Sequence, residues 1–112
     1  MNIISANESI MVPEHYTGIV KFVVGTTTWF KDGKRHREDG PASIWATGRK
    51  IWYLEDKLIW SSGWKPINLK DKIIFSKEIH PEYPTVQIWK YLDKNGIREQ
   101  VIISGMEEYV VE

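Results

Sequence analysis

The chain of 112 residues contains no cysteine. Disulfide bonds, thiolate nucleophiles and the common zinc sites are therefore excluded together, and the absence agrees with a reducing compartment. An excess of charge is also missing, because 15 Lys and Arg residues balance 15 Asp and Glu residues. The whole-molecule field that draws a protein onto nucleic acid or an anionic membrane is thus lacking. Any such contact would have to be local.

Long apolar stretches are missing as well. No run of about 18 apolar residues occurs, as a membrane-spanning helix needs, and residues 1–8 lack the basic region and apolar core of a secretory signal. We therefore expect a cytoplasmic protein without a membrane segment. With 42% apolar and 12% aromatic residues, a chain of this length can close one core. A single domain over residues 1–112 is expected.

The sequence does contain an internal repeat. The run WFKDGKRHREDGPA at residues 29–42 returns in decayed form 23 residues later. The matched pairs are Trp29 with Trp52, Phe30 with Tyr53, Lys34 with Lys57 and Gly40 with Gly63. The interval fits a short aromatic strand, a turn, a second strand and a loop, which is the unit of hairpin arrays.

Alternating β-branched and aromatic residues predict three hairpins. Their strands cover residues 19–24 and 26–30, 43–46 and 50–54, and 85–92 and 97–104. Gly25, Gly48 and the turn at residues 93–96 separate the strands of each pair, since glycine supplies the positive φ that a tight turn requires. Residues 106–111 are predicted as an edge strand.

The segment between Trp60 and Pro84 has no clear period. Leu69, Ile73 and Ile74 could share one helical face, but residues 73–75 are equally a buried strand. A short helix near residues 68–79 and a strand therefore both stay open. Pro81 and Pro84 end whatever precedes them, because proline lacks a backbone donor and restricts the residue before it.

Several of the repeated residues resemble the MORN family, including the MORN-like antitoxin arrays of bacteriophages and bacteria. The resemblance is carried by Gly33, residues 36–42, Gly48, Trp52 and Tyr53, and it covers residues 18–63. Residues 59–64 read IWSSGW where the pattern would repeat HREDGP, so the repeat ends there. The resemblance implies a mainly β fold of antiparallel stacked hairpins, with a repeat region at 18–66. Residues beyond Pro66 lie outside the resemblance, and we expect a capping segment and a hairpin at 67–112.

The string HREDGPA at residues 36–42 has two interpretations. Structurally, Gly40 adopts a conformation closed to other residues, Pro41 stiffens the entry into the next strand, and Asp39 bonds loop amides. The chemical alternative is an acid–base or metal cluster of His36, Glu38 and Asp39. We favour the structural interpretation, because stacking explains a residue that every repeat requires. No catalytic residue, metal or cofactor is predicted.

The repeat itself is assigned Trp29, Gly33, His36, Asp39, Gly40, Pro41, Gly48 and Trp52. Trp29, Trp45 and Trp52 are expected to be the buried rungs of the array. Two other groups are candidates for partner binding. One is formed by Trp60, Trp64 and Trp89, which are expected to be at least partly exposed, and the other by Lys34, Arg35 and Arg37 in a basic turn.

These features favour a non-catalytic protein-binding module. The resemblance makes a phage-borne or antitoxin-like inhibitor of a bacterial defence or toxin protein its most concrete form. Two alternatives remain. One is a nucleic-acid-binding module that uses the basic turn from Lys31 to Arg37, beside the aromatic Trp29 and Phe30. The other is a self-associating structural module that forms a homodimer.

Overall fold

The structure is a computed structural model that describes residues 2–8 and 11–112. The chain forms two compact units, of which the first comprises Met1–Arg37 and Pro41–Gly63 and the second Glu38–Gly40 and Trp64–Glu112. Both units are built from strands, which confirms the mainly β fold. The single domain over residues 1–112 stays a prediction.

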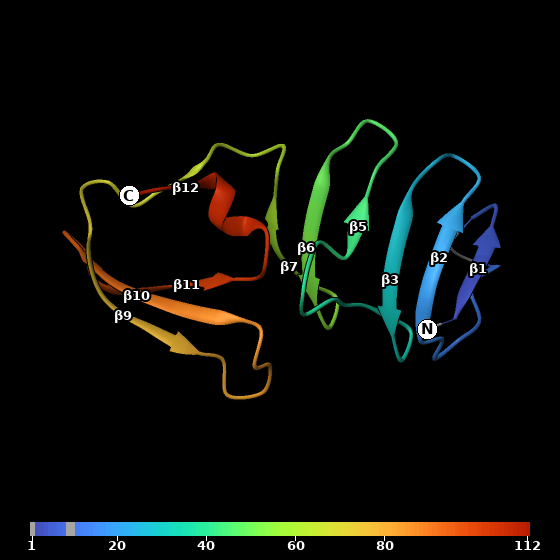
Figure 1. Cartoon of the computed structure of the whole chain (residues 1–112), viewed down its shortest axis with the longest axis horizontal. Coiled ribbons are helices and arrows are strands. Elements are labelled where there is room, and N and C mark those ends of the chain that lie inside the picture. The colour runs from blue at the N-terminus through green and yellow to red at the C-terminus, as the bar shows by residue number, and fades with distance from the viewer. Residues whose placement is uncertain (1, 9–10) are drawn as a thin grey trace. The chain divides into compact units, whose positions relative to one another are not determined.

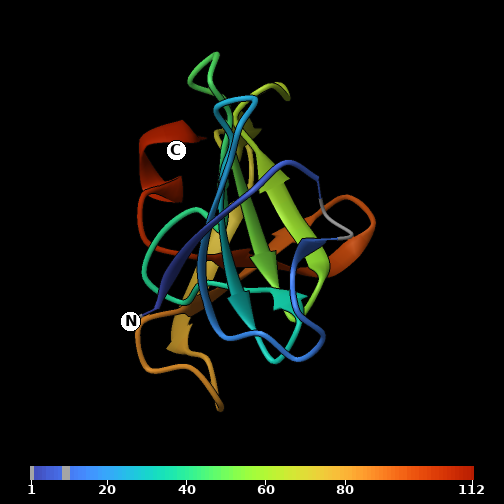
Figure 2. The same cartoon turned by 90° about the vertical axis from the view of Figure 1, so that its right-hand side faces the viewer.

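One mixed seven-stranded sheet forms the first unit (Figure 1). Its strands are β1 (Ile3–Ala6), β2 (Gly18–Phe22), β3 (Thr27–Lys31), β4 (Lys34–Arg35), β5 (Ser43–Ile44), β6 (Lys50–Leu54) and β7 (Lys57–Ser61). The strand order is β1-β2-β3-β5-β6-β7, with β4 also paired to β3, and every pair except β1–β2 is antiparallel. Figure 2 views the first unit from its β1 side. The predicted hairpins β2–β3 and β5–β6 are confirmed.

These two hairpins close with the same turn, 23 residues apart. The Gly25 N–H donates to the Phe22 carbonyl, and the Gly48 N–H donates to the Trp45 carbonyl, each at 2.9 Å. The φ angles of the two glycines are 96° and 92°. The repeat interval read from the sequence is therefore an interval between equivalent turns.

Alanine substitutions at Gly25 and Gly48 should separate backbone strain from steric conflict. Both variants force a side chain into the left-handed region, which costs about 1–2 kcal/mol. A Cβ at Gly25 would also lie 2.7 Å from the Ala46 Cβ, whereas nothing lies within 4 Å of a Cβ at Gly48. We expect Gly25→Ala to lose a further ~1–3 kcal/mol of unfolding free energy. Urea denaturation measures both losses, and equal losses would contradict the close approach of Ala46.

The loop at residues 36–42 braces the first hairpin against the second. The His36 N–H donates to the Trp29 carbonyl at 3.0 Å, and the Trp29 N–H donates to the Ala42 carbonyl at 2.7 Å. The Ala42 N–H in turn donates to the Ile51 carbonyl of β6 at 2.9 Å. β4 and β5 both pair with β3, and the loop connects them. The three hydrogen bonds satisfy backbone groups in the interval between these two pairings.

The conformational role predicted for Gly40 is wrong. Among the described glycines, positive φ angles occur at Gly18, Gly25, Gly33, Gly48, Gly96 and Gly105, and Gly40 does not belong to this group. Pro41 explains the difference, because a residue before proline is pushed toward extended conformations. Gly40 is nevertheless buried.

The three tryptophans expected to be buried rungs differ in how far their side chains are exposed. Trp52 is 1% exposed, and its ring centroid lies 5.9 Å from that of Trp60. Trp29 is half-buried beneath the Arg37 guanidinium, which lies 4.1 Å from the ring centroid. Trp45 is 40% exposed, so the expectation is wrong for it. The reason is that β5 ends at Ile44, which leaves Trp45 in the turn.

The described residues of the second unit contain five strands (Figure 1). They are β8 (Ile67–Asn68), β9 (Ile73–Ile79), β10 (Gln87–Asp93), β11 (Gly96–Ile102) and β12 (Val110–Val111). The antiparallel sheet has the order β11-β10-β9, while β8 and β12 pair in parallel. The hairpin predicted at residues 85–104 is confirmed. The edge strand predicted at 106–111 is confirmed only for β12, because Met106–Tyr109 is a 3-10 helix.

The short helix considered near residues 68–79 is wrong. The Asn68 side chain accepts the Lys70 N–H at 3.0 Å, and the Lys72 N–H donates to the Leu69 carbonyl at 3.1 Å. These bonds make tight turns, in which an Asn side chain competes with helix formation. Beyond them, β9 pairs with β10 along its length, with one register shift.

Candidate binding face

Two of the three tryptophans predicted to anchor a partner are buried. Trp60 and Trp89 are each 5% exposed, whereas Trp64 is 53% exposed. The predicted exposure is therefore wrong for Trp60 and Trp89. The Trp60 ring packs near Trp52, and the Trp89 indole N–H donates to the Gln87 side chain at 2.9 Å.

Two of the cations in the predicted basic turn are engaged within the first unit. The Arg35 guanidinium lies 4.3 Å from the Tyr53 ring centroid and donates to the Tyr53 hydroxyl at 3.2 Å. The Arg37 guanidinium stacks on Trp29 and donates to the Pro41 carbonyl at 3.2 Å. Lys34 is exposed. The structure thus uses both arginines to hold parts of the repeat region together.

Asp56 is the acidic partner of this turn. Partial burial would raise the pKa of its carboxyl, but hydrogen bonds from the Arg35 backbone N–H at 2.8 Å and guanidinium at 3.0 Å outweigh this and lower the pKa. Because the folded-state pKa is lowered, the stabilisation is present above the unfolded-state pKa and is lost as pH falls through the folded-state pKa. Both side chains are nearly half exposed, so the ion pair is worth only ~0–1 kcal/mol.

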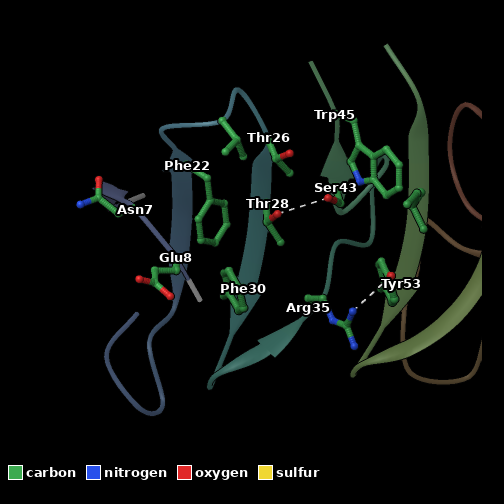
Figure 3. A pocket seen from close by; sticks show the side chains of 12 residues that line it. Asn7, Glu8, Phe22, Thr26, Thr28, Phe30, Arg35, Ser43, Trp45 and Tyr53 are labelled. Carbon is green, nitrogen blue, oxygen red and sulfur yellow. Dashed lines mark hydrogen bonds between the residues drawn. The ribbon is translucent and has the colours of Figure 1, made fainter. Parts of the chain in front are cut away.

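An open hollow of about 380 Å³ lies on one face of the first unit's sheet (Figure 3). It is lined by Asn7, Glu8, Phe22, Val24, Thr26, Thr28, Phe30, Arg35, Ser43, Trp45, Ile51 and Tyr53. Four of these residues are aromatic. Phe22 and Phe30 lie on β2 and β3, Trp45 lies in the β5–β6 turn, and Tyr53 lies on β6. We call these four side chains and the surface between them the aromatic hollow.

The aromatic hollow is a product of the repeat. Phe22 and Trp45 occupy one repeat position, each three residues before its turn glycine, and Phe30 and Tyr53 occupy another. Consecutive repeats therefore each contribute two aromatic rings. The sequence comparison matched Tyr53 to Phe30 but missed Trp45 as the counterpart of Phe22. The common spacing to the turn glycine is the signal that would have found it.

The floor of the hollow consists of one apolar side chain and two hydroxyl groups that are hydrogen-bonded to each other. Thr28 pairs with Ser43 across β3 and β5, and Ser43 pairs with Ile51 across β5 and β6, so the three side chains share one face. All three are buried, and the Thr28 and Ser43 hydroxyl oxygens lie 3.2 Å apart in a hydrogen bond. The floor thus leaves no hydroxyl in need of a ligand.

Charged side chains lie on both sides of the hollow. Arg49 does not line the hollow, but its guanidinium lies 4.9 Å from the ring centroid of the exposed lining residue Trp45. Within the described part of the chain, Arg49 makes no ion pair. Glu8 lies on the opposite side of the hollow from Trp45 (Figure 3). The hollow therefore has the Glu8 carboxylate on one side and, next to the lining residue Trp45 on the other side, the Arg49 guanidinium.

The alternative metal or acid–base cluster receives no support from the geometry. Residues 2–8 and 11–112 contain no group of three or more His, Asp or Glu side chains that could hold a metal ion. His36 is 4% exposed, and its Nδ1 accepts the Glu55 backbone N–H at 2.9 Å. This bond ties the loop at residues 36–42 to the β6–β7 turn, which is a structural role.

Comparison of the chain with protein-family models, with curated proteins and with solved structures gives no match. The resemblance to the MORN family accordingly stays a prediction. In the portion of the chain that the structure describes, no helix is long and apolar enough to cross a membrane.

Proposed function

We propose that this chain is a non-catalytic protein-binding module and that the aromatic hollow is its binding face. The observation that carries this proposal is the convergence of four aromatic side chains around one open hollow, with Trp45 exposed at its rim. Trp, Tyr and Arg are the residues that most often anchor protein interfaces. Trp and Tyr do so because they bury a large area with only two side-chain torsions.

Local structure supports the same proposal. Trp45 begins the turn that the Gly48 N–H closes, and its own N–H donates to the Arg49 carbonyl at 2.9 Å. The turn therefore holds the backbone of the exposed ring before any partner arrives. A side chain on such a backbone loses less conformational entropy on binding than one on an unstructured loop.

A more specific version of the proposal rests on the resemblance to MORN-like antitoxin arrays. In this form the chain is a phage-borne or antitoxin-like inhibitor in the bacterial cytoplasm. It would act by occlusion, with the aromatic hollow covering a functional surface of a toxin or defence protein. This mechanism requires no catalytic group and no cofactor on the inhibitor.

Replacing Trp45 by alanine should remove most of the binding. The partner is first captured from the native cell and identified by mass spectrometry, and association and dissociation rates are then measured with the purified proteins. We expect Trp45→Ala to weaken binding by about 2–4 kcal/mol, which is roughly 30-fold to 1,000-fold, mainly through faster dissociation. Because Trp45 is 40% exposed, the variant should lose less than ~1–2 kcal/mol of unfolding free energy and should stay folded.

Trp64→Ala is the matched control, because it removes an exposed tryptophan from the second unit. We expect this variant to bind the partner within about twofold of the wild type, as is usual for residues outside a hot spot. A large loss in Trp64→Ala together with unchanged binding in Trp45→Ala would refute the proposed binding face. That result would place the interface in the second unit.

Self-association is a second candidate function, favoured by the open edge of β9. This strand pairs only with β10 among the described strands, and Ile73, Phe75 and Ile79 on it are 64%, 53% and 68% exposed. Exposed apolar edge strands pair readily with other chains. Sedimentation velocity of the purified chain distinguishes the candidates, because a stable dimer without a foreign partner favours self-association.

A further inference from the structure

We infer that the aromatic hollow is specific for an acidic partner segment, in which a large apolar side chain enters the hollow and a neighbouring carboxylate pairs with Arg49. This inference rests on the proposed function of the same face and names the chemistry of its partner. It also makes Arg49 the residue that determines specificity.

Arg35 lines the hollow, and Arg49 lies beside it against Trp45, but of the two only Arg49 lacks an ion-pair partner among the residues that the structure describes. Arg35 already pairs with the Asp56 carboxylate at 3.0 Å, so its charge is largely compensated. Arg49 has no ion-pair partner in the described residues, although its guanidinium stacks on Trp45. A carboxylate that approaches Arg49 therefore gains an ion pair without displacing an existing one.

The guanidinium of Arg49 has two neighbours. Its Cζ atom lies 4.9 Å from the Trp45 ring centroid, and the backbone of Gly63 also lies close to it. A Cβ at residue 63 would lie only 2.6 Å from the Arg49 guanidinium, so the absence of a side chain there makes room for it. The cation is thus positioned beside the exposed ring, which reduces the entropy lost when it pairs with a carboxylate.

The interior of the hollow suits an apolar group. Its lining includes four aromatic rings, and the Thr28 and Ser43 hydroxyls of the floor already bond to each other. The lining also contains the polar or charged residues Asn7, Glu8, Thr26 and Arg35. The volume of about 380 Å³ is near the lower end of ligand-sized cavities, which span roughly 300–1,000 Å³. The hollow therefore has room for one large apolar or aromatic side chain.

The distribution of charge fixes the orientation of the segment. Glu8 lies across the hollow from Trp45 (Figure 3), so a carboxylate at the Glu8 side would meet a like charge. Arg49 attracts a carboxylate at the Trp45 side. Electrostatic complementarity of this kind sets register and rejects wrong partners more than it adds affinity.

Short peptides with Gly and Ser flanks test the inference with the full chain. Fluorescence anisotropy compares peptides whose central triplets are Glu-Trp-Glu, Lys-Trp-Lys and Glu-Ala-Glu, together with a short oligothymidylate. We expect the Glu-Trp-Glu peptide to bind at least ~10-fold more tightly than each of the others, because it alone supplies both the carboxylate and the ring. Its affinity should fall as salt is raised.

Charge reversal at Arg49 provides the specific control. Arg49→Glu should invert the preference toward Lys-Trp-Lys, and Arg49→Gln should abolish the preference between the two tryptophan peptides. Lys21→Glu makes the same charge change on the opposite face of β2, since Lys21 alternates with Val20 and Phe22. This variant should keep the wild-type preference. Urea denaturation of each variant confirms that the compared proteins are folded.

Three outcomes would overturn the inference. They are equal or tighter binding of Lys-Trp-Lys to the wild type, tighter binding of oligothymidylate than of Glu-Trp-Glu, and binding of no peptide at all. The proposed function survives each of them if the captured protein partner still depends on Trp45. Conversely, Glu-Trp-Glu binding that depends on Arg49 supports the inference even if the natural partner docks elsewhere.

Discussion

Trp52→Ala should lower the free energy of unfolding by about 3–5 kcal/mol. Trp52 is the largest fully buried side chain in the described residues, with 1% of its surface exposed. Its ring lies 5.9 Å from the Trp60 ring, and the two residues are directly paired across β6 and β7. Removing the indole both forfeits its transfer from water and leaves a cavity that a sheet of paired strands cannot easily close.

Urea denaturation followed by far-ultraviolet circular dichroism measures this loss, since tryptophan fluorescence itself changes in the variant. Trp45→Ala is the matched control, because Trp45 is a tryptophan of the same unit with 40% of its surface exposed. We expect the control to lose less than ~1–2 kcal/mol, in proportion to its smaller buried area. Similar losses in the two variants would contradict the assignment of Trp52 to the core and Trp45 to the surface.

The hairpins of this fold were predictable because their signals are local. A turn glycine with positive φ, such as Gly25 or Gly48, stands between β-branched and aromatic runs, and sequence alone reveals this order. The segment at residues 68–79 was not settled because its apolar residues fit two periods. Pairing of β9 with β10 decided it in favour of a strand, and the apolar pattern of the segment by itself does not show this pairing.

The burial of individual tryptophans was less predictable than the strands. Trp60 precedes Ser61 and Ser62, and this polar surrounding suggested exposure. In a strand, however, a neighbour in sequence points to the opposite face, so polarity next to Trp60 says little about its own side. For Trp45 the error was the opposite one, since it was predicted to be buried and is exposed. The strand predicted at residues 43–46 ends two residues earlier, at Ile44, which leaves Trp45 in the turn.

The aromatic hollow shows what a repeat interval can and cannot reveal. The interval of 23 residues relates Phe22 to Trp45 and Phe30 to Tyr53. It does not show that all four rings share one face, because this depends on the pairing register of β2, β3, β5 and β6. A shift of one residue in any pair would have moved a ring to the other side of the sheet.

Trp89→Ala should destabilise the fold by about 3–5 kcal/mol and should not remove a binding contact. The sequence had suggested Trp89 as a partner anchor, but its side chain is 5% exposed in the second unit. The Lys77 ammonium lies 3.9 Å from the ring centroid, and the indole N–H donates to Gln87. Trp89 is therefore a core residue: its ring is buried, its indole N–H has an acceptor, and the Lys77 ammonium covers one face of the ring.

Two variants of the second unit separate this role from binding. Trp89→Phe keeps an aromatic face for Lys77 but leaves the Gln87 oxygen without its donor, so we expect a smaller loss of about 1–3 kcal/mol. Trp64→Ala, which removes an indole that is 53% exposed, should lose less than ~1–2 kcal/mol. Partner affinity measured for Trp89→Ala and corrected for the folded fraction should equal that of the wild type. If the corrected affinity falls while the unfolding free energy is unchanged, Trp89 contacts the partner and its assignment to the core is wrong.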